Sequence, residues 1–311
     1  MKTLFLSPSY VCNEKCIFCP CALNARRYTP LTLEELCNAI DIAIEQESIE
    51  MVLISGGEPT IYRDIINLIS YIKKKGLKFG MLSNSLKFSN VKFLNEFIET
   101  VGNNFELTTA FHSWDGNTHD MITSIPGSFN KSLQGVVNLV QKGVNVTIKH
   151  IINNTTYKEL PQYVDWLYDT FPDSVPWVLC NIDLAGTALM NEDYSAVPFS
   201  FSKPYLEKAL DKVIEYSKNG RNRIVRIFNT PLCCIDPYYW PFLQKYESEE
   251  DMTALYLPYE KNEDNRIRFN LKGDGGARFK PCKECIIQSK CPGTWKQTAE
   301  VLGEDSFIPF K

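Results

Sequence analysis

Residues 12–21 read Cys-Asn-Glu-Lys-Cys-Ile-Phe-Cys-Pro-Cys, so four of the chain's eleven cysteines lie in one short stretch. The first three, Cys12, Cys16 and Cys19, have the spacing C-x3-C-x2-C. Structural zinc sites pair a C-x2-4-C unit with ligands well downstream, and a thioredoxin-type dithiol is a single C-x-x-C. Three thiolates in one loop can instead bind three irons of a cubane cluster and leave the fourth iron open. Disulfides, zinc, a redox dithiol and an iron–sulfur cluster are the four alternatives that this stretch raises.

The composition narrows these alternatives. The chain has 311 residues, 44% of them hydrophobic and 23% charged, which indicates a soluble globular protein and excludes the disordered classes. It shows neither a signal peptide nor an apolar run long enough to span a membrane, so we expect a cytoplasmic protein. Clustered cysteines in that reducing compartment are typical of metal ligands or reactive thiols. The net charge of −4 gives no basic surface that would indicate a nucleic-acid partner.

Apolar patterns along the first two thirds of the chain alternate between strand and helix. This alternation predicts an α/β fold with a parallel sheet, and six such units fit a partial (β/α)6 TIM-type barrel better than a closed barrel of eight. The predicted strands are Thr3–Pro8, Met51–Ile54, Lys78–Ser83, Phe105–Phe111, Val144–Ile152 and Val175–Leu179. The predicted helices begin near Thr32, where Glu35 completes a capping box, and then cover Ile65–Ile72, Val91–Ile98, Phe129–Val140, Tyr157–Tyr168 and Tyr205–Tyr216.

Unusual sequence falls at the predicted strand ends, where barrels of this class place reactive groups. The second strand ends in Gly56-Gly57-Glu58-Pro59, the third in Ser83-Asn84 and the fourth in His112-Ser113-Trp114-Asp115. With the cysteine loop after the first strand, these segments predict one site at the carboxyl edge of the sheet.

The cysteine loop, with the aromatic Phe18 before its last cysteine, resembles the signature of the radical S-adenosylmethionine (radical SAM) superfamily. The Gly-Gly-Glu-Pro turn is similar to the superfamily's second motif. The resemblance implies that Cys12, Cys16 and Cys19 hold a 4Fe–4S cluster whose open iron binds the amino and carboxylate groups of SAM. It also implies that reduction cleaves SAM to a 5′-deoxyadenosyl radical, which abstracts a hydrogen atom from a substrate. Residues 56–59 would then hold the ammonium group of SAM, which needs acceptors and a closely approaching backbone.

The same resemblance implies further cofactor-binding positions at strand ends: Ser83, Asn84, Ser113 and Asn153. Many relatives place an arginine before the Gly-Ser-Phe that matches residues 127–129, whereas this chain has Thr-Ser-Ile-Pro there. Lys149 or His150 is our candidate for the missing carboxylate-binding cation. His112 is a candidate catalytic residue for substrate contact or proton transfer, with a structural role as the alternative, and His119 is expected to be a loop or helix-start residue.

Residues 220–311 differ in character from residues 1–219, which we assign to the barrel. A C-x2-C-x5-C segment, Cys282, Cys285 and Cys291, resembles part of the auxiliary-cluster domain of SPASM and Twitch enzymes. The resemblance implies a small Twitch-like domain with a second 4Fe–4S cluster, whose fourth ligand is one of Cys233 and Cys234. A structural zinc site is the alternative. Three other cysteines are expected to pack as small apolar residues: Cys21, Cys37 and Cys180.

The sequence indicates the substrate less specifically than it indicates the cofactors. The resemblance to enzymes of this layout implies that the chain modifies a side chain of a ribosomally made peptide or protein, by a crosslink, a thioether or an oxidation. Radical oxidation or rearrangement of a small molecule is the alternative. A non-catalytic metal-binding module is the second alternative. A reductant such as flavodoxin or ferredoxin is implied as a partner. The chain starts at its first strand, so we expect a separate leader-binding protein or direct docking of a peptide. The aromatic segments 238–240 and 256–259 are candidate walls of a substrate groove.

Overall fold

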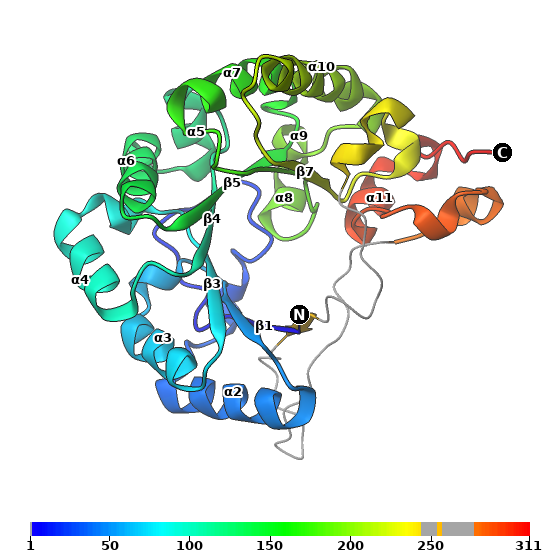
Figure 1. Ribbon diagram of the computed structural model, residues 1–311. Coiled ribbons are helices and arrows are strands. Elements are labelled where there is room, and N and C mark those ends of the chain that lie inside the picture. Colours follow the sequence, from blue (N-terminus) through cyan, green and yellow to red (C-terminus); the bar gives the residue numbers. More distant parts are fainter. Residues whose placement is uncertain (1, 244–253, 257–276) are drawn as a thin grey trace.

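The computed structural model describes residues 2–243, 254–256 and 277–311. Its centre is one curved sheet with the strand order β7-β6-β5-β4-β3-β2-β1-β8, and neighbouring strands of the sheet pair in parallel (Figure 1). The strands are β1 Thr3–Leu6, β2 Met51–Ile54, β3 Lys78–Leu82, β4 Glu106–Ala110, β5 Asn145–Ile152, β6 Trp177–Asn181, β7 Val225–Phe228 and β8 Ala254–Tyr256. From β1 to β7 each strand pairs with the next strand along the chain, which is the open-barrel arrangement that the sequence predicted.

Helices cover the convex side of this sheet (Figure 1). The long ones are α2 Leu33–Glu47, α3 Ile65–Lys74, α4 Val91–Val101, α6 Ser128–Gln141, α7 Leu160–Thr170 and α10 Phe199–Lys218. Shorter helices lie in the connections: α1 Asn24–Arg27, α5 Gly116–Thr123, α8 Thr187–Met190, α9 Glu192–Ser195 and α11 Lys296–Leu302. No helix among the described residues is long and apolar enough to cross a bilayer.

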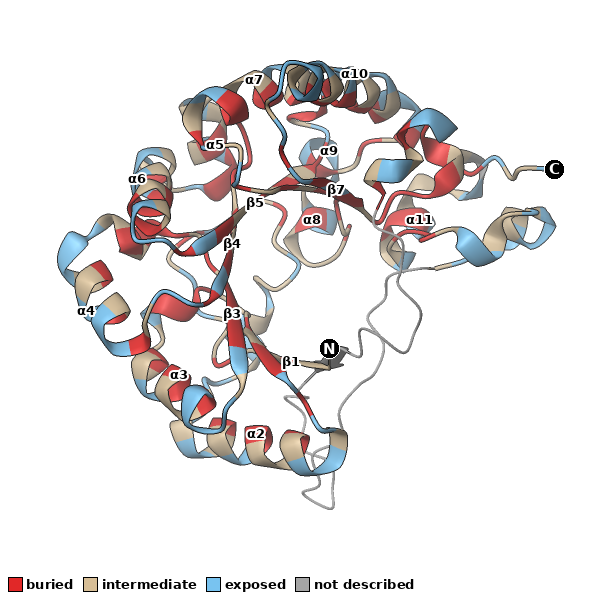
Figure 2. Cartoon of the chain, viewed as in Figure 1, coloured by how far each residue is buried: buried red, intermediate tan, exposed pale blue. Residues whose placement is uncertain are grey.

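The core lies between the sheet and its outer helices. Along β5 every second residue is buried, and Val146, Ile148 and Ile152 join the same apolar cluster as Leu36 and Ile40 of α2. Figure 2 shows this layer as buried residues on the strands and on the helix faces turned toward them. Alternation with a period of two places the other residues of β5 on the inner face, where the partial barrel leaves them incompletely covered.

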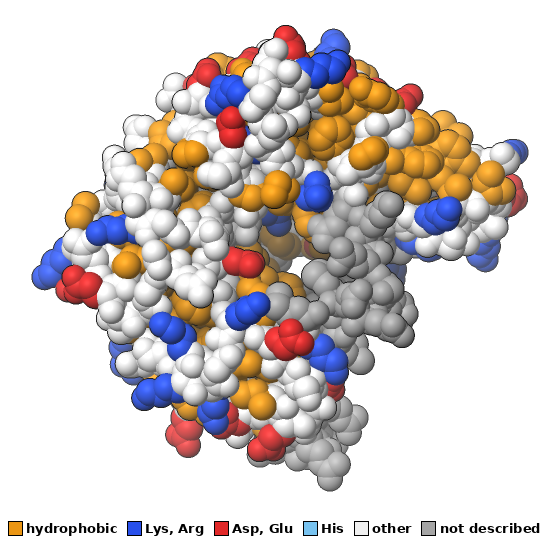
Figure 3. Space-filling model, in the orientation of Figure 1, with side chains coloured by type: hydrophobic (Ala, Val, Ile, Leu, Met, Phe, Trp, Pro, Cys, Tyr) orange, Lys and Arg blue, Asp and Glu red, His pale blue; other side chains and the backbone are white. Residues whose placement is uncertain are grey.

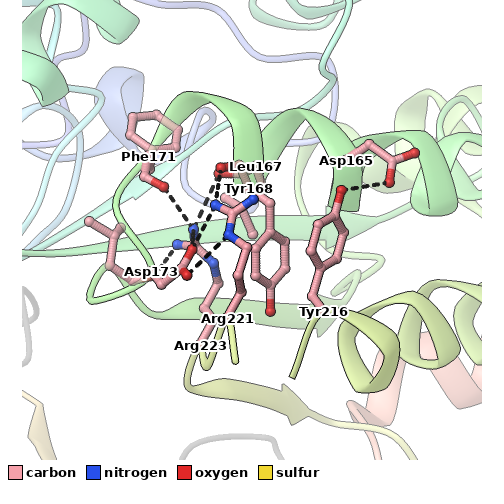
Figure 4. A network of polar contacts seen from close by, with 9 residues as sticks. Asp165, Leu167, Tyr168, Phe171, Asp173, Tyr216, Arg221 and Arg223 are labelled. Atoms are coloured by element: carbon pink, nitrogen blue, oxygen red, sulfur yellow. Dashed lines mark hydrogen bonds and ion pairs between the residues drawn. The ribbon is translucent and has the colours of Figure 1, made fainter. Parts of the chain in front are cut away.

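A network of polar contacts, here called the polar clamp, lies at the amino end of β7 (Figure 4). The fully buried Arg223 side chain donates hydrogen bonds to the carbonyls of Val175, Leu167 and Phe171, at 3.3 Å for Leu167 and 2.9 Å for Phe171. Its neighbour Arg221 forms an ion pair with Asp173 at 2.9 Å. A buried guanidinium needs such partners, because an unpaired charge in the interior is strongly unfavourable. The clamp therefore joins the end of α7 to the segment that enters β7.

The element predictions were close, with three differences. The sheet extends beyond the six predicted strands, because β7 pairs with β6 past the predicted boundary at residue 219 and β8 pairs with β1; the division at residue 219 stays a prediction. Helix α10 begins at Phe199 rather than Tyr205, because Pro204 inside it interrupts the helical pattern without ending the helix. Helix α5 was not predicted, since its apolar pattern is weak and its start depends on Asp115, whose side chain accepts from the Thr118 amide.

Candidate functional site at the carboxyl edge of the sheet

The cysteine loop follows β1 and is held on one side by α5. The backbone amides of Lys15 and Ile17 donate to the carbonyls of Thr123 and Ile122, each at 2.9 Å. These bonds fix the middle of the C-x3-C-x2-C segment against the end of a helix. The loop is therefore a positioned element rather than a free surface turn.

The connection after β6 holds the cysteine loop on a second side. The Thr187 hydroxyl donates to the carbonyls of Cys16 and Cys19 at 3.2 and 3.0 Å, and the Asn191 amide donates to that of Ile17 at 2.8 Å. Gly186 has φ +59°, and a Cβ there would lie 2.5 Å from the Pro20 carbonyl oxygen. Only glycine permits this approach. Our sequence reasoning missed these three residues; a lone glycine after the sixth strand was the available signal.

The backbone of the Gly-Gly-Glu turn holds another side of the cysteine loop through hydrogen bonds. The amides of Gly57 and Glu58 donate to the carbonyls of Ser9 and Val11 at 2.8 and 2.9 Å. A Cβ on Gly57 would lie 2.1 Å from the Val11 oxygen, and Gly56 has φ +105°. We expected these glycines to allow close approach of a ligand; in the structure they allow close approach of the cysteine loop.

Glu58 is the buried anion at the centre of the site. Its Oε1 accepts from the Thr60 amide and hydroxyl and from the Ser83 hydroxyl, at 2.9, 2.6 and 2.8 Å. Its Oε2 accepts from the Asn84 amide at 2.7 Å, the one bond to that oxygen among the described residues. Burial raises the pKa of Glu58, and the donors act in the opposite direction. Oε2 thus has capacity for a further donor such as an ammonium group.

Asn84 connects the third strand to the cysteine loop. Its side-chain amide donates to Oδ1 of Asn13 at 2.7 Å, while its own Oδ1 accepts from the Leu86 amide. Glu14, which the sequence analysis did not single out, is also buried here. Burial, followed by the charge of Glu58, raises the Glu14 pKa to about 7.

The three loop thiols lie within electrostatic range of one another. Desolvation by the surrounding loop raises the pKa of Cys12 to about 12 although the residue keeps an exposed surface, and burial raises those of Cys16 and Cys19. For Cys16 the charges of Glu14, Cys19 and Cys12 add to the effect of burial. Thiols in such surroundings become thiolates when a metal coordinates them.

His112 lies beside this loop at the end of β4. Its ring meets the edge of Phe18 with centroids 4.9 Å apart, and its backbone amide donates to Nδ1 of His119 at 3.2 Å. Burial, followed by the charges of His119, His150 and Lys149, holds the pKa of His112 well below its usual range. The residue is therefore a neutral imidazole near the cluster loop. His119, expected in a loop or at a helix start, is a buried residue within α5 that supports it.

Two predicted cofactor-binding residues are engaged in local structure. The Ser113 hydroxyl donates to Glu159 at 2.9 Å and accepts from the Asp115 amide. The Asn153 amide donates to the Ile151 carbonyl and to the Thr156 hydroxyl at 2.7 and 2.9 Å. Both side chains hold the connections after β4 and β5 in place, and their roles toward a cofactor stay predictions.

The two candidates for a carboxylate-binding cation lie on opposite faces of β5. His150 faces the helices, 4.4 Å from the Tyr163 ring between centroids, with Nδ1 3.1 Å from the Phe111 carbonyl. Burial lowers its pKa to about 4, so it is neutral, and the suggestion that His150 supplies a cation was wrong. Lys149 lies on the inner face and is half-buried.

A second cysteine group lines a small cavity near the C-terminus. Its walls include four thiol-bearing residues and several apolar ones: Cys233, Cys282, Cys285, Cys291, Leu232, Phe279, Phe307 and Phe310. The amides of Leu232 and Gly293 donate to the Cys291 sulfur, each at 3.4 Å. Cys234 instead packs with Phe199, Ala299 and Phe307. The sulfurs of the two adjacent cysteines lie 3.9 Å apart, and of the two it is Cys233 that lines the cavity.

Over residues 2–243, 254–256 and 277–311, no three Cys, His, Asp or Glu side chains converge tightly enough to hold a single metal ion. In a cubane cluster each thiolate binds a different iron, so its ligands need not share one centre.

Of the remaining cysteines, Cys21 and Cys37 are partly buried, and Cys180 is buried and accepts from the Asn229 amide at 3.4 Å. These three are consistent with packed residues. The predicted groove segment 238–240 lies in the described part of the chain, whereas residues 257–259 lie outside it.

Comparison with known proteins gives the following matches. Residues 6–167 match the Radical SAM superfamily. An Fe-coproporphyrin III synthase from Methanosarcina barkeri is 28% identical over 82% of this chain, which spans 61% of that relative's length. A probable GTP 3′,8-cyclase from Sulfurisphaera tokodaii is 23% identical over 75% of each chain.

Two solved structures share the fold. Streptococcus suis SuiB bound to the precursor peptide SuiA has a TM-score of 0.66 and 13% identity, covering 100% of this chain and 75% of its own. The protein anSMEcpe with bound AdoMet and a Cp18Cys peptide has a TM-score of 0.63 and 17% identity, covering 99% and 92%. The shared architecture therefore covers nearly the whole of this chain.

Proposed function

The chain belongs to the radical SAM superfamily of enzymes, and from this premise we propose that it abstracts a hydrogen atom from a side chain of a ribosomally made peptide or protein. The observation that carries the proposal is the joining of three strand ends around the cysteine loop. Gly57, Glu58 and Asn84 all bond to one another or to that loop. When bound, the reduced 4Fe–4S cluster and SAM supply the radical. The protein positions both.

The residues fit those cofactors. Cys12, Cys16 and Cys19 offer three thiols in a loop that is fixed by Thr187 and by the Gly-Gly turn. A 4Fe–4S cluster needs this donor chemistry. The free capacity of Glu58 Oε2 suits the ammonium group of SAM, and the buried Phe18 and His112 form an apolar wall beside the loop. Binding there would exclude water from the reacting atoms.

A peptide substrate is supported by the two solved structures that share the fold. Both were obtained with peptides bound, SuiA in one and Cp18Cys in the other. Their identities of 13% and 17% carry the fold alone, so the substrate class is our inference. A reductant of the flavodoxin or ferredoxin kind and a separate leader-binding protein would be the partners of such a reaction.

A small-molecule substrate is the second candidate, because the curated relatives are named Fe-coproporphyrin III synthase and probable GTP 3′,8-cyclase. Deuterium transfer separates the two. The reconstituted protein is incubated with SAM, dithionite and either perdeuterated GTP or a deuterated synthetic peptide library. Deuterium in 5′-deoxyadenosine from peptides alone supports the proposal, and deuterium from GTP alone overturns it in favour of the second candidate.

We also propose a second 4Fe–4S cluster in the C-terminal cavity, with Cys233, Cys282, Cys285 and Cys291 as ligands. Three observations support this: all four line the cavity, two backbone amides donate to the Cys291 sulfur, and Cys234 is not among the residues that line the cavity. Amide donors stabilise thiolate sulfur and tune the potential of bound clusters. A zinc ion is the alternative occupant, which metal analysis distinguishes. Residues 220–311 would then form the Twitch-like unit.

A further inference from the structure

The inner faces of β5 and β7 each carry a basic side chain, Lys149 on β5 and Arg226 on β7. In β5 the buried residues Ile148, His150 and Ile152 face the helices, so Lys149 between them faces inward. In β7 the buried residues Val225 and Ile227 face the helices, so Arg226 also faces inward and is exposed.

The register of β5, β6 and β7 places these two residues in one row across the sheet. Lys149 is the partner of Val178 on β6, and Val178 is the partner of Arg226 on β7. Neighbouring strands lie about 4.8 Å apart, so the two Cα atoms are separated by roughly 10 Å. Both side chains are long and flexible enough to reach a common group between them. The smaller Val178, half-buried, leaves that space open.

Neither cation has an acidic partner among the described residues. The ion pairs of the described chain include neither Lys149 nor Arg226, and the one hydrogen bond of Arg226 goes from Nη1 to the Val225 carbonyl at 2.9 Å. Two like charges held on one wall repel each other and favour an anion between them.

Figure 3 shows the molecule hollowed at the centre of the ring of strands, with a basic side chain over β7 at the rim. The remaining inner-face acid on the neighbouring strands is Glu106 at the start of β4, four residues before Ala110, which is the row partner of Lys149. Glu106 therefore lies about 13 Å further along its strand and does not neutralise the pair.

We propose that Lys149 and Arg226 form a substrate-binding site for an anionic group, a carboxylate or a phosphate, inside the partial barrel. The inference rests on the proposed function. The carboxylate of SAM is not the anion that Arg226 binds, because that carboxylate shares a carbon with the ammonium group held at the end of β2. Strand β7 lies five strands away from β2 in the sheet. A substrate that extends from the cluster loop across the hollow would reach both cations.

The test uses the full chain, reconstituted anaerobically and saturated with SAM, and two probes: pyrophosphate for a phosphate and glutarate for a carboxylate. Calorimetric titration should show binding of at least one probe. Lys149→Met and Arg226→Met should each weaken it by roughly tenfold, which corresponds to about 1.4 kcal/mol. Lys131→Met and Arg63→Met remove exposed cations elsewhere and should leave probe binding unchanged.

Binding of pyrophosphate alone assigns a phosphate to the substrate, and binding of glutarate alone assigns a carboxylate. Absence of binding by the wild type, or equal binding by Lys149→Met, Arg226→Met and the wild type, overturns the inference. Production of 5′-deoxyadenosine by the same wild-type sample is measured in parallel. If that product forms while no probe binds, only the anion site is wrong; if it does not form, the proposed function fails whatever the probes show.

Discussion

The side-chain amide of Asn84 donates a 2.7 Å hydrogen bond to Oδ1 of Asn13, joining the end of the third strand to the cysteine loop across 71 positions of sequence. The same residue donates its backbone amide to Glu58. Asn84 therefore links the two motifs that define the site. The link is a contact between side chains from two separate segments, so the sequence of neither motif alone predicts it.

Replacing Asn84 with alanine should loosen the cysteine loop while leaving the fold intact. We expect SAM affinity to fall by roughly tenfold, because one hydrogen bond to a partly buried polar group contributes about 1 kcal/mol and its partner is left unpaired. Titration calorimetry with SAM checks this. Asn103→Ala is the matched control, since its amide also donates to a distant carbonyl, that of Lys142, at the opposite edge of the sheet. Equal affinities in Asn84→Ala and wild type would contradict the role of the link.

Gly57→Ala should prevent the cysteine loop from closing. The added Cβ would meet the Val11 carbonyl oxygen at 2.1 Å, which no rotamer change relieves. We expect loss of most of the iron bound at the first site, measured as iron and sulfide per chain after reconstitution. Gly76→Ala places a methyl group where nothing lies within 4 Å and should retain the iron, with a cost of about 1 kcal/mol for its positive φ. Full iron content in Gly57→Ala would show that the glycine pair is dispensable.

Cys233→Ala and Cys234→Ala form a matched pair that tests the second cluster. The wild type should bind about eight irons, Cys233→Ala about four to five and Cys234→Ala about eight, because one cubane carries four irons and Cys233, rather than Cys234, lines the cavity. Zinc in place of the second set of irons would favour the structural-zinc alternative. The reverse pattern, with iron lost in Cys234→Ala only, would exchange the two assignments.

Arg223→Met should destabilise the fold without affecting cofactors. The change removes a fully buried guanidinium from three carbonyls and from the Tyr168 ring, 4.7 Å from its centroid. The loss should be about 3 kcal/mol, measured by urea unfolding of the metal-free chain. Arg221→Met, at the solvent edge of the same clamp, should cost less. A smaller effect for Arg223 than for Arg221 would argue against the clamp.

The buried His150 should make stability depend on pH. Its pKa is lowered to about 4 by burial, whereas the unfolded value is about 6.5, so the unfolded chain binds the extra proton in this range. The contribution is complete above pH 6.5 and is lost as the pH falls toward 4, by about 3 kcal/mol. His150→Gln keeps a donor and removes the titration. Its unfolding free energy should fall less steeply between pH 6.5 and 4; an identical slope would show that His150 does not contribute.

Short-range patterns predicted the strands, the helices and the two motifs because their information lies within a few residues. Thr32 and Glu35, for example, form the predicted capping box in the structure. Gly186 and Thr187 escaped prediction because their partners, Cys16 and Cys19, lie about 170 positions earlier. The choice between Cys233 and Cys234 depends on how two neighbouring side chains diverge from a short 3-10 helix, which spacing does not determine. His150 was misjudged because the face of a strand, rather than its sequence position, decides whether a histidine is charged.

The central claim is that Cys12, Cys16 and Cys19 support reductive cleavage of SAM. The direct measurement is 5′-deoxyadenosine formed by anaerobically reconstituted protein with SAM and dithionite. The wild type and Cys37→Ala, which alters a half-buried helix cysteine far from the loop, should both form the product. Cys16→Ala should form none above the protein-free background. Equal product from Cys16→Ala and wild type, or no product from fully reconstituted wild type, would contradict the account.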